Sequence, residues 1–315
     1  MTGQGSADLA ADTAVRADPE TPGRYLIDLA NHWDYLLPSG GAVMTCALRA
    51  AQAHIADPEL RLASATTIFA TPIHPGPLVA DVHLIRKGGN TAQVRVVLHH
   101  AQARPPEPGL EMLATFCRDR KGPDVIGVGF PAVRSVADAL PTDDGAPNNP
   151  HTRFRIFQQL DCKLADGEAF WRPDFAAGPA RFARWFRYKV PQRDAEGRLD
   201  RLAIPPLIDT MPTALQRAIG PGTYRFYAPS LDLTLYTVDD TTREWLLVSV
   251  TLRRARAGCA IADAEVWDDE GRLIAYGAQA MYLHSLSGDP PVLDASGRGP
   301  QLSLARAISG RSAVR

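Results

Sequence analysis

The sequence predicts an α+β fold in which one supersecondary unit occurs twice, each copy a long antiparallel sheet curved around a central helix. Three observations support this prediction. A small and apolar helix pattern at 38–55 is followed by four strand-like segments. A second helix pattern at 204–222 is also followed by four strand-like segments. Between the two units, residues 121–151 are rich in Pro, Gly and Asp, which is typical of a linker.

The first unit begins with strand-like residues at 24–33, ahead of its helix. The helix opens at Ser39, Gly40 and Gly41 and then carries small or apolar residues on most sides, so we expect a sheet to enclose it. The Lys-Gly-Gly-Asn stretch at 87–90 suits a hairpin, because glycine accepts the positive φ that such turns need. The four strands are expected at 62–72, 76–88, 91–103 and 109–120.

The second unit has strand-like segments at 152–164 and 180–190 ahead of its helix. Pro212 fits only the first turn of that helix, and Gly220 followed by proline ends it. The last three strand-like segments are joined by short connectors that end in glycine, which predicts an antiparallel meander. The four strands are expected at 223–238, 243–256, 258–269 and 272–283.

A curved antiparallel sheet around one helix is the hot-dog arrangement, so the sequence predicts a double hot-dog. We expect the two halves to form a pseudo-dimer with a continuous sheet, and further homodimerisation would be compatible with the fold. The predicted divisions are a flexible N-terminus at 1–22, a first hot-dog at 23–120, a linker at 121–151, a second hot-dog at 152–284 and a C-terminal tail at 285–315 with a short helical turn at 302–308.

Composition excludes several classes of function. The chain of 315 residues is 45% hydrophobic and 22% charged with a formal net charge of −1, which argues against nucleic acid or an anionic membrane as a partner held by bulk charge. Neither a signal-peptide pattern nor a run of 18 apolar residues is present, so we expect a cytoplasmic protein. The four cysteines lack metal-ligand spacing and are expected to be buried, reduced thiols.

One polar residue interrupts an otherwise apolar or small strand at 271–283. Gln279 alternates in phase with the core-facing positions of that strand, so its amide should be buried and must find hydrogen-bond partners. Ala275 and Gly277 beside it are small, which indicates that a helix or a ligand approaches this face closely. The segment therefore predicts a functional site inside the second unit.

The duplication, with SGGAVMTCALRAA early and REWLLVSVTLRRARAGCAIADAEVWDDEGRLIAYGAQA late, resembles the acyl-CoA thioesterase II family over about residues 24–284. In that family an Asp, a Ser or Thr, and a Gln of the second hot-dog hold the attacking water. The resemblance assigns these catalytic roles to Asp209 at the start of the second helix, to Ser230 where better-known members carry Thr, and to Gln279. It implies an acyl-CoA substrate, a place in fatty acid metabolism, and neither cofactor nor metal.

The chemistry of thioester hydrolysis suggests what further residues would do. Asp is a weak general base at its ordinary pKa of about 3.9 unless burial raises that pKa. Backbone N–H groups at a helix N-terminus could stabilise the oxyanion, and the candidates are the helix of Asp209 or the turn at Gly40 and Gly41. Arg253 and Arg254, near a strand end, could meet the CoA phosphates, although solvated strand-end charge is the alternative.

Simpler interpretations stay open at this point. Asp209 could only cap a helix, Gln279 could only join a strand to the helix, and Ser230 in a strand could have no special role. At the level of function, the alternatives are a non-catalytic acyl-CoA or acyl-carrier binding protein and a hot-dog hydratase or dehydratase. The hydratase would need a His near an acid in a helix-opening loop, and the sequence places none there convincingly.

Overall fold

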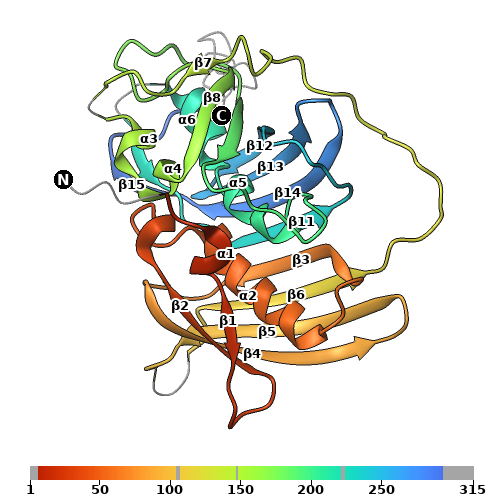
Figure 1. Ribbon diagram of the computed structural model, residues 1–315. Coiled ribbons are helices and arrows are strands. Elements are labelled where there is room, and N and C mark those ends of the chain that lie inside the picture. Colours follow the sequence, from red (N-terminus) through yellow and green to blue (C-terminus); the bar gives the residue numbers. More distant parts are fainter. Residues whose placement is uncertain (1–5, 104–106, 147, 221–223, 294–315) are drawn as a thin grey trace, which may run out of the picture.

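A computed structural model of the chain describes residues 6–103, 107–146, 148–220 and 224–293. The helical turn expected at 302–308 lies outside these residues. Within them, 13 strands form one sheet in the order β1-β2-β4-β5-β6-β3-β11-β14-β13-β12-β9-β8-β7. Figure 1 shows the two halves of this sheet meeting at β3 and β11, with the segment that joins the halves running along one side. The double hot-dog prediction is confirmed.

The first half follows the predicted helix and strands closely. Helix α2 is enclosed on most sides, since all of its alanines except Ala53 are buried. The Ser39 hydroxyl caps its start by accepting from the Ala42 N–H at 3.1 Å. Its elements are α1 (Leu9–Asp12), β1 (Val15–Ala17), β2 (Arg24–Leu29), a 3₁₀ turn (Asn31–Trp33), α2 (Gly40–Ile55), β3 (Arg61–Phe69), β4 (Gly76–Lys87), β5 (Thr91–His100) and β6 (Leu110–Cys117).

The N-terminal segment differs from the expected flexible arm. Leu9 is fully buried, and the Asp12 carboxylate accepts a hydrogen bond from the Trp33 indole at 2.8 Å. Strand β1 pairs with β2, so these residues extend the edge of the first half. The sequence signal was missed because the apolar residues are too few to show a periodicity. Of the four cysteines that were expected to be buried, only Cys46 is; Cys117 and Cys162 are half-buried and Cys259 is exposed, and none forms a disulfide.

The second half begins at the linker and contains more breaks than the sequence predicts. Part of the strand expected at 152–164 is helical, and the strand expected at 223–238 is divided into β10 and β11. Its elements are β7 (Leu140–Pro141), α3 (Pro150–Arg153), α4 (Arg155–Gln158), β8 (Leu160–Asp166), β9 (Arg181–Tyr188), a 3₁₀ turn (Arg201–Ala203), α5 (Pro205–Ile208), α6 (Pro212–Ile219), β10 (Arg225–Tyr227), β11 (Asp232–Thr237), β12 (Leu246–Arg256), β13 (Cys259–Asp268), β14 (Leu273–Tyr282) and β15 (His284–Ser287).

Two of these breaks shape the region around the second helix. The expected single helix is interrupted, since α5 ends at Ile208 and α6 starts at Pro212, which occupies the first turn as predicted. Strand β10 leaves the main sheet and pairs with β15, a short strand in what was expected to be the tail. Asp209 lies between α5 and α6, and Ser230 lies between β10 and β11, so both residues fall at breaks in the regular elements.

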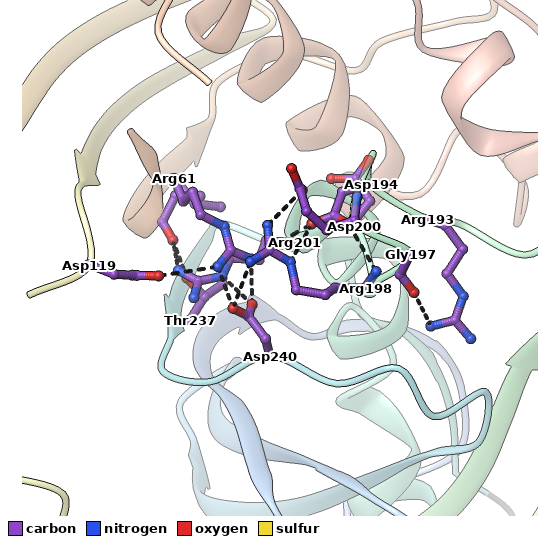
Figure 2. Close-up of polar contacts among 12 residues, drawn as sticks. Arg61, Asp119, Arg193, Asp194, Gly197, Arg198, Asp200, Arg201, Thr237 and Asp240 are labelled. Atoms are coloured by element: carbon purple, nitrogen blue, oxygen red, sulfur yellow. Dashed lines mark hydrogen bonds and ion pairs between the residues drawn. The ribbon is translucent and has the colours of Figure 1, made fainter. Parts of the chain in front are cut away.

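Polar side chains fasten the two halves together beside the junction of β3 and β11 (Figure 2). The Asp240 carboxylate, just after β11, accepts hydrogen bonds from Arg61 of β3 and from Arg201, the latter at 3.0 Å. Burial tends to raise the pKa of Asp240, but these two guanidinium groups lower it to about 2. Arg201 also donates to the Leu62 carbonyl at 2.8 Å. The network therefore fixes the second half against the first at neutral pH.

Helix α2 touches α5 backbone to backbone at Gly41. A Cβ atom at Gly41 would lie 2.3 Å from the Pro205 carbonyl oxygen and 2.5 Å from the Pro206 Cα, so only glycine fits. The Thr45 hydroxyl reinforces the contact by donating to the Leu202 carbonyl at 2.9 Å. This contact brings the start of the first helix against the end of α5, where Asp209 follows.

We expect Gly41→Ala to destabilise the protein by about 3 kcal/mol, because the added methyl group must push two helices apart in a packed interior. The gain in helix propensity of about 1 kcal/mol does not offset this. Chemical denaturation of the variant and the native chain measures the difference. Gly89→Ala is the control, since a Cβ there meets nothing within 4 Å. Equal denaturation midpoints for the Gly41 variant and the native chain would contradict the close contact.

Candidate active site

Three polar side chains from distant parts of the second half meet beside the first helix. The Asp209 Oδ1 atom accepts hydrogen bonds from the Gln279 Nε2 at 2.7 Å and from the Ser230 hydroxyl at 3.1 Å. The Gln279 Nε2 also donates to the Ser230 Oγ at 2.6 Å. Each donor hydrogen of the Gln279 amide thus has an acceptor, and the three groups form a closed triangle.

Asp209 reaches this triangle because α5 lies tightly on β14. A Cβ at Gly277 would lie 2.7 Å from the Ile208 Cδ1, so the glycine makes room for the last residue of α5. The small residues at 275–277 therefore do admit a helix, as the sequence indicated. Gln279 lies two residues farther along the strand on the same face, directly below the carboxylate.

Ser230 is held by the segment between β10 and β11. It forms an isolated bridge with Met281 of β14, and the Leu231 N–H donates to the Ala280 carbonyl at 2.8 Å. The Asp232 carboxylate accepts from the Ala280 N–H at 2.7 Å. The loop is thus joined to β14 on both sides of Ser230, which keeps its hydroxyl next to Gln279.

The other carboxylate oxygen of Asp209 faces the first half of the molecule. Its Oδ2 accepts the Gly41 N–H at 3.0 Å, in the first turn of α2, and a Cβ at Gly40 would lie 3.3 Å from it. A helix N-terminus stabilises negative charge. Asp209 does not cap its own helix, since Met211 is the N-cap of α6 and makes no side-chain bond. The expectation that Asp209 starts the second helix is corrected: it follows α5.

Burial sets the protonation behaviour of Asp209. The carboxylate is only 7% exposed, and burial raises its pKa above the ordinary value, while the donors from Gly41, Gln279 and Ser230 oppose that rise. A carboxylate with a raised pKa accepts a proton more readily than a free one does. It is still surrounded by donors, so its ionised form keeps three hydrogen bonds.

One atom of the triangle is left without a partner. The Gln279 Oε1 is buried, and no donor among the described residues reaches it. Buried acceptors are nearly always hydrogen-bonded, so this oxygen indicates a place for a donor from outside the chain, such as a water molecule. The arrangement can therefore hold a small donor between a carboxylate and an amide oxygen.

The two arginines predicted to bind phosphates do not join this group. Gln279 pairs with Ala262 in β13 and faces the interior, whereas Arg253 binds the carboxylate of the next residue, Asp263, which points to the opposite face of the sheet. Arg254 is exposed at the same strand. Arg253 thus already has an acidic partner within the protein.

Aromatic side chains that sequence reasoning missed surround the triangle. The Tyr35 hydroxyl donates to the Asp209 backbone carbonyl at 3.3 Å, and the Phe69 ring lies over Gly40. Burial, together with the Asp209 charge, raises the pKa of Tyr227. Neither Phe69 nor Tyr227 lies in a recognisable sequence pattern. Tyr35 lies just before the glycine turn, and that position could have indicated a role for it.

Comparison with known proteins agrees with this architecture. Residues 29–117 match the family model of the acyl-CoA thioesterase N-terminal domain, and residues 135–283 match that of the acyl-CoA thioesterase C-terminal domain. No curated protein matches the sequence.

Solved structures share the fold at low sequence identity. A conserved protein of unknown function with a hot-dog fold from Alicyclobacillus acidocaldarius has a TM-score of 0.72 at 20% identity, covering 90% of this chain and 98% of that one. The acyl-CoA thioesterase II TesB2 from Mycobacterium marinum has a TM-score of 0.65 at 20% identity, covering 90% and 100%. A tesB protein from Mycobacterium avium subspecies paratuberculosis has a TM-score of 0.65 at 17% identity, covering 87% and 97%.

In the described part of the chain, no group of three His, Cys, Asp or Glu side chains is arranged to hold a metal ion. None of its helices is long and apolar enough to cross a membrane.

We expect carbon-13 NMR to give an Asp209 pKa above the ordinary value near 3.9, because burial outweighs the hydrogen bonds. Ser230→Ala removes one donor to the carboxylate and should raise that pKa further. In the folded protein the ionised form is the costly one, so this group's contribution to stability is full below the unfolded-state pKa and is lost as pH rises through the raised folded-state pKa. An Asp209 pKa at or below the ordinary value for aspartate would contradict the assignment.

Proposed function

Because the chain belongs to the acyl-CoA thioesterase family built from two hot-dog domains, we propose that it hydrolyses acyl-CoA to a free carboxylic acid and CoA. The observation that carries the proposal is the triangle of Asp209, Ser230 and Gln279 with its one unpartnered oxygen. A water molecule placed there would donate one hydrogen to the Gln279 Oε1 and the other to the Asp209 carboxylate. Ser230, which forms a hydrogen bond with each of them, would keep the Asp209 and Gln279 side chains in position.

The reaction then proceeds by addition and elimination. Asp209 takes a proton from the water while the water oxygen bonds to the thioester carbonyl carbon, giving a tetrahedral oxyanion. The carbon–sulfur bond breaks next. The departing sulfur takes the proton back from Asp209, so CoA leaves as its thiol. A buried carboxylate with a raised pKa suits the first step, because it is a stronger base than a free carboxylate.

The start of α2 supplies the positive potential for the oxyanion. The Gly40 and Gly41 backbone lies beside the carboxylate, and Gly41 already donates to Asp209. Because the Gly41 N–H is already engaged with Asp209, this turn would act on the oxyanion mainly through the positive potential of the helix N-terminus. Its position beside the triangle favours the glycine turn of the first half over the helix of Asp209 as the source of that stabilisation.

A non-catalytic acyl-CoA binding protein is the rival proposal. It would use the same scaffold but would release no CoA from any thioester. Thiol detection with a panel of acyl-CoA chain lengths decides between the two. Tight binding with no thiol release on any chain length would favour the binding protein.

Asp209→Ala should lower kcat/KM by about 10²- to 10⁴-fold, the usual contribution of a positioned general base. Release of CoA is measured for native and variant chains, with circular dichroism to confirm folding. Asp174→Asn changes an exposed carboxyl elsewhere and should leave the rate unaltered. Undiminished turnover in Asp209→Ala would remove this residue from the mechanism.

Ser230→Thr should keep kcat/KM within about threefold, whereas Ser230→Ala should lower it about 10- to 100-fold. The hydroxyl that donates to Asp209 is retained in the first variant and absent in the second, and one hydrogen bond to a charged group contributes about 1.5–3 kcal/mol. Steady-state kinetics with one acyl-CoA measure both. Equal activities of the Thr and Ala variants would show that the hydroxyl does not act.

A further inference from the structure

A second buried charge lies near the site and has no acidic partner. Arg184 of β9 is 2% exposed, and neither of its terminal nitrogens has a hydrogen-bond partner among the residues that the structure describes. Three phenylalanine rings surround its guanidinium, at 5.4, 5.5 and 4.9 Å from Phe157, Phe182 and Phe186. Cation–π contacts of this kind make the buried charge tolerable but leave the planar fork of N–H donors unused.

His151 forms a second unpartnered polar group beside the same aromatic cluster. Neither of its ring nitrogens has a partner in the described chain, and its ring packs on Phe157 at 4.5 Å and on Trp171 at 5.1 Å. Burial, and then the Arg184 charge, lower the pKa of His151, so it is neutral and offers one N–H donor. Two buried donor groups at one place indicate that an acceptor is missing from it.

A short series of contacts joins this cluster to the catalytic carboxylate. Tyr35, whose hydroxyl binds the Asp209 carbonyl at 3.3 Å, packs its ring on Phe157 at 5.7 Å, and Phe157 lies against Arg184. The residues of this series are aromatic, which suits contact with a chain of methylene groups. An acyl group that follows them from the reacting carbonyl past Tyr35 would end at Arg184, and the packed rings would have to part to admit it.

A hollow bordered by arginines lies beside this aromatic cluster. The hollow of about 380 Å³ is lined by Phe154, Phe170 and Trp171, and these rings pack on Tyr35, Phe182 and His151 respectively. The remaining lining residues are Asn148, Pro150, Arg153, Gln216 and Arg225, so two further arginines and no carboxylate border it. Arg184 and His151 do not line this hollow; it borders the rings that pack on His151 and Phe182, and its arginines add positive charge near the cluster.

We propose that Arg184, with His151, binds a carboxylate at the far end of the acyl group, so that the preferred substrates are thioesters of dicarboxylic acids. The guanidinium fork matches a carboxylate in a two-bond arrangement, and a methyl end would leave those donors unpaired. This inference rests on the proposed thioesterase function and names the substrate class of that site.

The test compares carboxyl-ended with methyl-ended substrates of equal length: succinyl- with butyryl-CoA, adipoyl- with hexanoyl-CoA, and suberoyl- with octanoyl-CoA. At the best length we expect the native protein to favour the carboxyl-ended member by at least about 10-fold in kcat/KM. Arg184→Met should lower kcat/KM for that member by about 10- to 100-fold, the usual effect of a hydrogen bond to a charged group, and leave the methyl-ended member within about threefold.

Two further variants control for folding and for general loss of charge. Arg187→Met removes an arginine of the same strand that binds Asp161 at 2.8 Å, and it should alter neither substrate class. Arg184→Lys keeps the charge without the fork and should fall between the native protein and Arg184→Met. Because the buried charge has no partner, Arg184→Met should unfold at a temperature no lower than that of the native chain.

Each contrary result has one meaning. Equal or better turnover of every methyl-ended substrate, or equal losses for both classes in Arg184→Met, overturns the carboxylate site while leaving the thioesterase function intact. The same acyl groups on N-acetylcysteamine lack the CoA phosphates. If the carboxyl preference and its loss in Arg184→Met vanish there, Arg184 responds to the phosphates and the inference fails. Absence of thiol release from every thioester would instead overturn the proposed function.

Discussion

The backbone contact between α2 and α5 is the constraint on which the site depends. Gly41 leaves no side chain between the helices, so the end of α5 lies against the first turn of α2. Asp209 and Gly41 are 168 residues apart in the chain yet form one hydrogen bond. The first half provides the helix N-terminus, and the second provides the carboxylate, hydroxyl and amide. Neither hot-dog could build this arrangement alone, which gives a physical reason for their fusion into a continuous sheet.

Two of the buried charged side chains in the interior, Asp209 and Arg184, have different kinds of partner. Burying an ion costs several kcal/mol even after the protein relaxes, and a hydrogen bond to a charged group returns about 1.5–3 kcal/mol. Asp209 accepts three such bonds, so it can remain ionised, although burial still raises its pKa. Arg184 has aromatic rings instead, worth up to about 2 kcal/mol each, and its donors stay unpaired. The first pattern suits a base, and the second suits recognition.

The likeness to solved hot-dog structures, at about 20% identity, concerns the fold. Hot-dog proteins can carry different activities on one scaffold, so function has to be argued from the site itself. In this chain the Gln279 oxygen, which has no partner among the described residues, lies beside a buried carboxylate, and the family membership narrows the reaction to thioester hydrolysis. The aromatic series from Tyr35 to Arg184 is a feature of this chain's own side chains.

Local patterns by themselves determined the repeated helix-and-strand order, because alternation along strands, turn glycines and a small apolar helix are properties of neighbouring residues. Gln279 could be identified as well, since one amide in an apolar strand needs buried partners. Only the tertiary structure decided that the second helix breaks at Asp209, which helix end meets the carboxylate, and that Arg253 binds Asp263. It also decided that Arg184 meets no acid within the described part of the chain. Those outcomes depend on contacts between segments far apart in the chain, and no local pattern encodes which distant segments will meet.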